Sequence, residues 1–381
     1  MRRYRTAPTF IANTIMDPCQ EVRTTCRHWM ELEPAWDQPK TGRRSVKIHK
    51  EHLPRLAEDI IAKKEKSPSW IEWDEENWHY SGEKYTGSVA QKNERIALYI
   101  LALDAINFCF WPNRNGENGD NPLEYEHLAI ALRKLAEADD ESGDPTVVED
   151  GATVVNCAES YALSPQNLKA MTAEKMESLL KPHLGEYYLD NIQKRAMLWS
   201  EVGEALLQNF EGSATLFLDK AENHAPNLVQ LVINNFPGFC DQAKLDGGLI
   251  SFLKRAQIFV GDVNAALKLD LGGMNQLTTF ADYRVPQILR HFDIMEYSPS
   301  LAQTVDAEEE IKMDSTDEIS IRAATVAAVD DLVELLNLDK RVKSGEPFTA
   351  VTVDWYLWQV GERMHQDGAL KPFHRVRTQF Y

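Results

Sequence analysis

Acidic side chains set among aromatic and apolar residues are the feature of this sequence best suited to chemistry. Four segments share it: Phe236-Pro-Gly-Phe-Cys-Asp241, Lys254-Arg-Ala-Gln-Ile-Phe-Val-Gly-Asp262, Phe280-Ala-Asp-Tyr-Arg284 and Val353-Asp-Trp-Tyr-Leu-Trp358. A carboxylate removed from water has a raised pKa or a fixed cationic partner, and both acid–base catalysis and cation recognition use that environment. One such acid alone is more simply a buried ion pair or a helix cap, but four in one chain favour a functional site.

The triplet Asp282-Tyr283-Arg284 has apolar residues on both sides. A solvated face would not need those neighbours, so the triplet indicates groups with buried partners or a chemical role. Pro286 suits the first turn of a helix over residues 285–292. The free backbone amides of that helix start would orient the carboxylate of Asp282.

Asp241 follows a turn with Phe236 and Phe239 at its ends. A planar heterocycle could stack on either ring while the acid faces an attached sugar. The alternative, equally favoured by the residues alone, is that Asp241 caps a helix that starts at Gln242.

Two further acids have mainly structural interpretations. Asp262 lies seven residues after Arg255, on the same face of a helix, and a structural ion pair between them is the preferred interpretation. Asp354 begins a helix that carries Trp355, where capping and ligand binding are compatible roles. The chain ends in a basic, aromatic segment, 371–381, which could hold a phosphate through His374, Arg375 or Arg377 but is more simply docked onto the acidic body.

Helical periodicity predicts the elements that position these residues. The predicted helices are 19–30, 51–64, 93–111, 125–138, 172–180, 191–210, 216–236, 248–269, 285–292, 298–303, 319–338 and 352–364. Residues 46–48 form a short extended piece, and 70–80 interleave tryptophans with acids in short strands or an aromatic-rich loop. Strand-like alternation is scarce, so the sequence predicts an all-α protein with few short strands.

Length and charge constrain the class of protein. At 381 residues and 43% hydrophobic, the chain can bury one large core, which we place at 41–381 after an N-terminal extension, 1–40, that packs on the main body. The loop 139–150 is an acidic surface insertion. The net charge of -18 would repel a phosphate backbone, so a small-molecule substrate is favoured over direct nucleic-acid binding.

The five cysteines form no CxxC pair and have no companion histidine spacing. Neither a zinc site nor a disulfide framework is expected, and a reducing, cytoplasmic compartment is favoured. No apolar run is long enough to cross a bilayer and no secretory signal is present. We expect a monomer without cofactor or metal, whose activity survives EDTA.

Taken together, six ordered motifs resemble the queuosine salvage proteins, the queuosine 5'-phosphate N-glycosylase/hydrolases. They are Leu103-Asp-Ala-Ile-Asn-Phe-Cys-Phe-Trp111, Phe236-Pro-Gly-Phe-Cys-Asp241, Leu253-Lys-Arg-Ala-Gln257, Phe280-Ala-Asp-Tyr-Arg-Val-Pro-Gln287, Asp354-Trp-Tyr-Leu-Trp358 and Pro372-Phe-His-Arg-Val-Arg377. The resemblance runs from about residue 40 to the C-terminus. It implies a single helical domain similar to the helix-hairpin-helix DNA glycosylases, which hydrolyses queuosine 5'-phosphate to queuine and ribose 5-phosphate.

The resemblance also implies roles for single residues. By analogy the active-site acid falls on Asp241 and the base-recognising acid on Asp354. Breaking a ribosyl C–N bond builds positive charge on the sugar, which a nearby carboxylate stabilises while it activates water. A 7-deazapurine has no N7 to protonate, so hydrogen bonds from groups such as Asp354 and Asn107 must assist its departure.

Other parts of the substrate need their own partners. The amine of queuine is cationic near neutral pH and suits Asp282 or Asp262 in an aromatic pocket. The 5'-phosphate needs cations, for which the candidates are Lys254, Arg255, Arg284 and the Arg375 region. The substrate-binding set is therefore predicted as Phe236, Phe239, Asp354, Asn107, Asp282, Tyr283, Arg284, Trp355, Lys254 and Arg255, around a catalytic Asp241.

Two other functions stay open. A base-excision glycosylase on DNA would need a basic groove, against which the net charge counts. A non-enzymatic protein that binds queuine or its nucleotide would bind without releasing ribose 5-phosphate.

Overall fold

The computed structural model describes residues 17–32, 44–67, 71–74, 76–111, 123–141, 161–245, 248–342 and 347–381. In these residues α-helices dominate, which confirms the predicted mostly α fold. The first seven helices are α1 (Pro18–Met30), α2 (Leu53–Lys66), α3 (Val89–Ala105), α4 (Tyr125–Glu141), α5 (Pro165–Lys169), α6 (Ala173–Leu184) and α7 (Ile192–Asn209). They are followed by α8 (Ala214–Asp219), α9 (Ala225–Asn235), α10 (Lys254–Leu267), α11 (Arg284–His291), α12 (Pro299–Asp306), α13 (Thr316–Leu338) and α14 (Ala350–Gln366).

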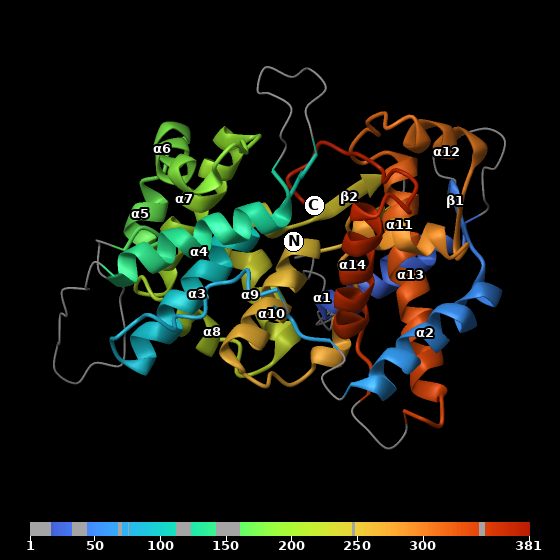
Figure 1. Cartoon of the computed structure of the whole chain (residues 1–381), viewed down its shortest axis with the longest axis horizontal. Coiled ribbons are helices and arrows are strands. Elements are labelled where there is room, and N and C mark those ends of the chain that lie inside the picture. Colours follow the sequence, from blue (N-terminus) through green and yellow to red (C-terminus); the bar gives the residue numbers. More distant parts are fainter. Residues whose placement is uncertain are drawn as a thin grey trace, which may run out of the picture.

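The helices form two groups with α10 between them. Figure 1 shows α3 to α8 on one side and α2 with α11 to α14 on the other. Helix α10 packs against α3 and α9, α11 packs against α14, and α1 packs against α13. The buried apolar side chains form one continuous core across these contacts. None of the helices in the described ranges is long and apolar enough to cross a membrane.

Two antiparallel strand pairs complete the fold. Strand β1 (Val46–Ile48) pairs with β4 (Met295–Tyr297), and β2 (Gln242–Leu245) pairs with β3 (Gly248–Ser251). The extended piece predicted at 46–48 is thus confirmed. It joins the chain before α2 to the chain after α11.

The second strand pair corrects two sequence predictions. Residues 248–251 belong to β3, not to a helix over 248–269, and α10 begins at Lys254 after Leu253 adopts a left-handed conformation, with φ 53°. Gln242 starts β2, so Asp241 does not cap a helix there. Hairpin pairing overrides the helical periodicity in this segment because it satisfies the backbone hydrogen bonds with a partner strand.

Other helix boundaries also differ from those predicted from the sequence. The segment predicted as one helix over 216–236 is divided into α8 and α9, and α3 ends at Ala105 instead of residue 111. Cys109 has a φ of 56°, a left-handed conformation that a continuing helix would not allow. Residues 106–111 therefore run along the site without regular secondary structure.

Part of the predicted N-terminal extension packs closely on the body of the protein. Asp17 caps α1 by accepting from the amide of Cys19 at 2.7 Å, and α1 buries Val22, Cys26 and Trp29. The rest of 1–40, and most of the acidic insertion, lie outside the described residues. The domain boundary at residue 40 and the likeness to helix-hairpin-helix glycosylases stay predictions.

Candidate active site

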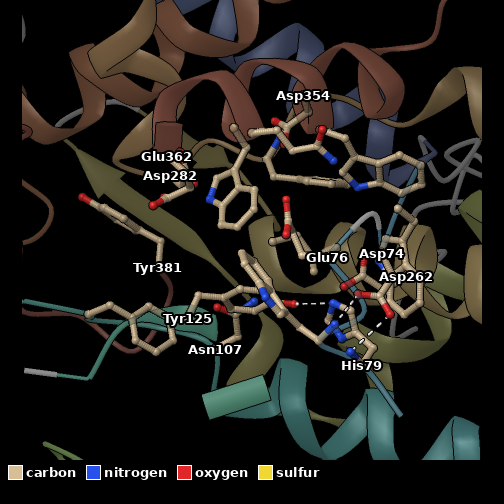
Figure 2. Close-up of a pocket in the computed structure, with 18 of the residues that line it drawn as sticks. Asp74, Glu76, His79, Asn107, Tyr125, Asp262, Asp282, Asp354, Glu362 and Tyr381 are labelled. Carbon is tan, nitrogen blue, oxygen red and sulfur yellow. Dashed lines mark hydrogen bonds between the residues drawn. The ribbon is translucent and has the colours of Figure 1, made fainter. Parts of the chain in front are cut away.

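A cavity of about 240 Å³ opens where α10, α14, the loop before α11 and residues 71–74 and 76–80 meet. Figure 2 shows the side chains around it. Its acids are Asp74, Glu76, Asp262, Asp282, Asp354 and Glu362. Aromatic rings form much of the wall, among them Trp73, Trp78, Tyr125, Tyr283, Trp355 and Trp358. Such a site suits a ligand with a flat ring and several polar or cationic groups.

The structure brings together about half of the predicted site residues. Those that line the cavity are Asn107, Lys254, Asp282, Tyr283, Asp354 and Trp355. Those that do not are Phe236, Phe239, Asp241, Arg255 and Arg284.

The start of α11 orients Asp282. Its Oδ1 accepts from the amides of Arg284 and Val285, both at 2.9 Å, as predicted for a carboxylate ahead of a helix start. In the described part of the chain, Oδ2 has no hydrogen bond and is free to act on a ligand. Burial raises the pKa of Asp282, while the charge of Lys254 and the helix amides oppose that rise.

Asp354 is the fifth residue of α14, which is capped by Thr349, so the predicted helix start and capping role at Asp354 are wrong. Its Oδ1 accepts from the amide of Phe280 at 2.8 Å and from the hydroxyl of Thr279. Burial, followed by the nearby charge of Asp282, raises the pKa of Asp354 well above its ordinary value. Asp354 is therefore the more readily protonated of the two acids, and its Oδ2 has no hydrogen bond within the described ranges.

Lys254 is the buried cation of this cavity, 5% exposed at the first position of α10. No ion pair of its ammonium group within 4.0 Å is found in the part of the chain described. Burial lowers its pKa, and Asp282 gives the largest opposing effect. A lysine in this setting is available to an anionic ligand.

A second group of acids lies toward residues 71–80 (Figure 2). Burial raises the pKa of Asp262 to about 7, and the charge of Asp74 adds to that rise. Trp73 stacks on His79 with ring centroids 4.3 Å apart, and burial lowers the pKa of His79 to about 3, so this imidazole is neutral. Acids and a flat ring together form an environment that suits a cation.

The expected ion pair between Asp262 and Arg255 is not present. Arg255 donates to the carbonyls of Asp104 at 3.1 Å, Ala105, and Gly238 at 2.5 Å. Its guanidinium thus ties the end of α3 to the turn before Asp241, so the structure does not support a phosphate-binding role.

Arg284 and the C-terminal arginines also have protein partners. Arg284 Nε donates to Glu362 at 2.7 Å and Nη1 donates to Gln287 at 2.7 Å. Arg375 pairs with Glu308 at 3.1 Å, and Arg377 pairs with Asp190 and Glu310, both at 2.8 Å. The C-terminal segment docks onto acids of the body, as predicted.

The structure places Asp241 behind the cavity wall. Its two oxygens accept from Arg322 at 2.9 and 2.5 Å. Phe236 and Phe239 are fully buried in the core, where Phe236 packs on Phe217 and Phe239 packs on the guanidinium of Arg255. This placement does not support a catalytic Asp241 or stacking of a base on these two rings.

Sequence reasoning missed the contribution of residues 71–80 to the site. Trp73, Asp74, Glu76, Trp78 and His79 all line the cavity. The sequence did indicate this segment, because acids are interleaved with tryptophans there and Asp354 also has tryptophans near it. The segment is a loop, however, so no helical periodicity predicts which way its side chains point. Tyr125 and Tyr381 were also missed.

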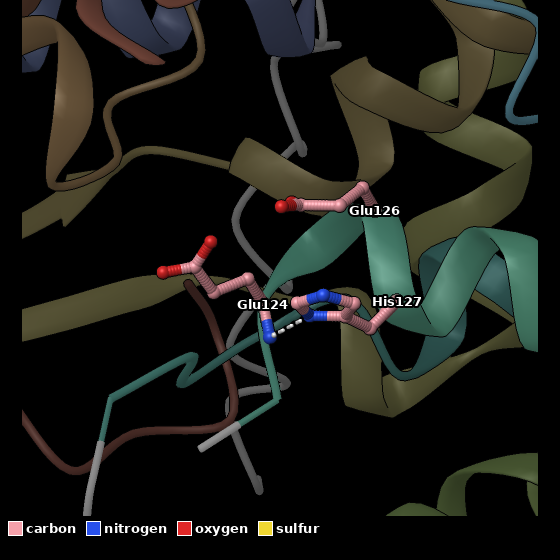
Figure 3. Close-up of side chains that lie close together, drawn as sticks. All are labelled: Glu124, Glu126 and His127. Atoms are coloured by element: carbon pink, nitrogen blue, oxygen red, sulfur yellow. Dashed lines mark hydrogen bonds between the residues drawn. The ribbon is translucent and has the colours of Figure 1, made fainter. Parts of the chain in front are cut away.

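A second cavity of about 260 Å³ adjoins the first and shares Phe110, Tyr125, Tyr283 and Glu362 with it. At its edge, Glu124, Glu126 and His127 bring one ligand atom each within 4.8 Å of one another (Figure 3). Nδ1 of His127 accepts from the amide of Glu124 at 3.1 Å, so the neutral ring carries its proton on Nε2 and offers no free lone pair to a metal ion. In this arrangement only the two glutamates could contact a cation, at the edge of the second cavity.

Fold and cavity define the class: an all-α protein with a buried site of carboxylates and aromatic rings for a small ligand. The sequence profile described as queuosine salvage protein matches residues 88–381. The chain belongs to the queuosine salvage protein family.

Similar proteins extend over nearly the same length. The queuosine 5'-phosphate N-glycosylase/hydrolase of Dictyostelium discoideum is 34% identical over 343 residues, 88% of this chain and 94% of that protein. The enzyme of the same name from Sphaerobacter thermophilus is 33% identical over 344 residues, covering 88% and 93%. The Mus musculus enzyme of that name is 27% identical over 352 residues, covering 89% and 95%.

Proposed function

We propose that this protein hydrolyses the N-glycosidic bond of queuosine 5'-phosphate and releases queuine and ribose 5-phosphate. The observation that carries the proposal is the pairing of Asp282 with Asp354 in one ring-walled cavity, in a chain similar over most of its length to enzymes named for this reaction. Release of queuine supplies the base for tRNA modification.

The two acids suit opposite tasks because their surroundings disfavour ionisation to different degrees. Asp282, supported by helix amides and Lys254, is the ionised group that stabilises the developing positive charge on ribose and accepts a proton from the attacking water. Asp354, kept protonated by burial, donates toward the departing base. Transfer of the proton from Asp282 back to Asp354 then restores the starting state.

The rest of the substrate has partners of matching charge. Lys254 binds the 5'-phosphate. Arg255 and Arg284 do not have this role, because their guanidinium groups are bonded to Gly238 and Glu362. Asp74, Glu76 and Asp262 receive the amine of queuine among Trp73 and its neighbours. The base lies between the rings of the wall.

The direct test is incubation of the purified protein with queuosine 5'-phosphate, with queuine and ribose 5-phosphate measured by mass spectrometry. Asp282→Asn should lower kcat by about 10²-fold or more. The matched control is Asp270→Asn, the same change at an exposed residue outside the cavity. Queuine binding without ribose 5-phosphate would instead identify a binding protein.

The acidic surface supports a small nucleotide as the partner instead of a nucleic acid. We further propose that the protein acts as a cytoplasmic monomer. Light scattering of the purified protein tests the monomer, and a fluorescent fusion tests the compartment.

A further inference from the structure

The ion pair of Asp241 with Arg322 lies directly behind one end of the cavity. Arg322, on α13, is 2% exposed and binds both oxygens of Asp241, at 2.9 and 2.5 Å. Its guanidinium carbon lies 4.0 Å from the ring centroid of Phe252 and 4.4 Å from that of Tyr381. The pair is enclosed by protein and neither member lines the cavity.

Asp241 fixes the start of α10, and with it Lys254. Its Oδ2 accepts from the amide of Lys254 at 3.2 Å. Its carbonyl accepts from the amides of Phe252 at 3.0 Å and Leu253 at 3.1 Å. These bonds stabilise the left-handed conformation of Leu253 that ends the hairpin and starts the helix.

Arg322 contacts two other parts of the cavity wall. Its Nε donates to the carbonyl of Ala281 at 3.0 Å, one residue before Asp282. Its planar face supports the ring of Tyr381, which lines the cavity. Lys254, Asp282 and Tyr381 are thus all bound, directly or through a neighbouring residue, to one rigid ion pair.

We infer that the Asp241–Arg322 pair is a positioning device that sets Lys254, Asp282 and Tyr381 relative to one another for catalysis. Two buried charges seldom add net stability compared with apolar residues of similar size, so a role in geometry accounts better for their presence. A fork of fixed hydrogen bonds holds a site more accurately than apolar packing does. The inference rests on the proposed function, because it assigns Lys254 and Asp282 to the reaction.

Asp354 makes no direct bond to this pair. Its Oδ1 is bound by Thr279 and Phe280, and its only link to the pair among these bonds is that Phe280 precedes the Ala281 held by Arg322. Loss of the pair should therefore lower turnover much more than binding of the free base. If the pair were merely structural, turnover and binding of the free base would fall together.

The experiment compares Asp241→Asn, Arg322→Met and the double variant that carries both changes. Each single variant leaves a buried group without its partner and should unfold at a lower temperature. The double variant removes both charges of the pair, and the buried Glu318, 3.9 Å from Arg322, can be neutralised by protonation, so most of the loss in Tm should be regained. Its kcat should stay about 10²-fold below that of the wild type, because misplacement of reacting groups by about 1 Å has that effect. Its Kd for queuine should change less than about threefold.

Recovery of kcat together with Tm in the double variant would overturn the inference. Arg322→Lys is the second variant, needed if the others fold poorly. It keeps a cation beside Asp241 but cannot make the fork and the bond to Ala281 together. It should fold, judged by circular dichroism, and still turn over about 10²-fold more slowly, and wild-type kcat in this variant would also overturn the inference.

The matched control is Arg95→Met, which breaks another buried pair, Arg95 with Asp140 at 2.8 Å, away from the cavity lining. Its folded fraction should have a kcat within about twofold of wild type. The proposed function fails by a different result, absence of ribose 5-phosphate with the wild-type protein. If the wild type is active, Asp282→Asn is inactive and the pair variants are fully active, only the positioning inference fails.

Discussion

At the scale of single residues, the protein disfavours the charged form of Asp354 more strongly than that of Asp282. Both carboxyls are buried, but Asp282 has Lys254 as its largest opposing influence, whereas Asp354 has the charge of Asp282 adding to the effect of burial. A pair of acids separated in this way can share one reaction as base and acid.

This separation predicts a bell-shaped dependence of kcat on pH. Activity should fall as pH drops through the raised pKa of Asp282, since the base must be ionised, and fall as pH rises through the raised pKa of Asp354, since the acid must hold its proton. Asp354→Asn cannot transfer a proton, so kcat should drop by about 10²-fold and the alkaline fall should vanish. If kcat of this variant still falls at alkaline pH, a group other than Asp354 causes that fall.

The raised pKa of Asp262 predicts that the free energy of unfolding depends on pH. Burial raises its pKa in the folded protein to about 7 from an ordinary value of 3.8, so the folded state binds more protons between these values and stability falls as pH rises through them. Asp262→Asn removes this effect. The free energy of unfolding should increase by about 1–3 kcal/mol at pH 8 and remain unchanged at pH 4.

Urea unfolding of wild type and Asp262→Asn at both pH values measures the difference. The same change at the exposed Asp293 is the control, and it should shift neither curve. An equal gain at pH 4 and pH 8 would show that the carboxylate charge is not responsible.

At the scale of elements, close helix contacts depend on particular glycines. A Cβ on Gly203 of α7 would lie 2.3 Å from the backbone nitrogen of Lys169 and 2.4 Å from the carbonyl oxygen of Pro165 in α5. A Cβ on Gly261 of α10 would meet Phe280 at 3.4 Å, an ordinary contact.

Alanine at these two positions should act in opposite directions. Gly203→Ala should lower the free energy of unfolding by about 2–3 kcal/mol, because backbone atoms of α5 must move. Gly261→Ala should raise it by about 0.5–1 kcal/mol through better helix propensity. Chemical denaturation of both variants checks the two predictions. An unchanged free energy of unfolding for Gly203→Ala would mean that α5 and α7 separate readily.

At the scale of the whole molecule, α1 belongs to the core, in agreement with the prediction that the N-terminal extension packs on the main body. It buries Val22, Cys26 and Trp29 against the body, and Arg23 binds Asp330 on α13 at 3.2 Å. Deletion of residues 1–32 should therefore expose an apolar face and lower Tm by about 10 °C or more. Gln20→Ala, an exposed change on the same helix, should leave Tm unaltered.

The overall charge predicts weak contact with nucleic acids. At -18, the protein should bind duplex DNA or tRNA no more tightly than a Kd of about 10⁻⁴ M at physiological salt. Fluorescence anisotropy with labelled oligonucleotides measures this. Micromolar binding would revive the alternative of a glycosylase that acts on nucleic acid.

The sequence by itself determined the helical class, most helix positions and the chemical character of the site. Helical periodicity and capping residues are local, so they could be read directly, as for the start of α11 beside Asp282. The unusual setting of acids among rings was also visible in the order of residues, and it identified Asp282 and Asp354 correctly as cavity residues.

Only the tertiary structure decided which acids face the cavity. Asp241 and Asp282 have similar neighbours in the sequence, but Arg322, 81 residues after Asp241, binds both oxygens of the first and neither of the second. Likewise, residues 71–74 and 76–80 line the site from a segment without helix or strand, and no local sequence pattern predicts where such a segment runs. The accessibility of a carboxylate depends on partners that are distant along the chain, and only folding brings those partners together.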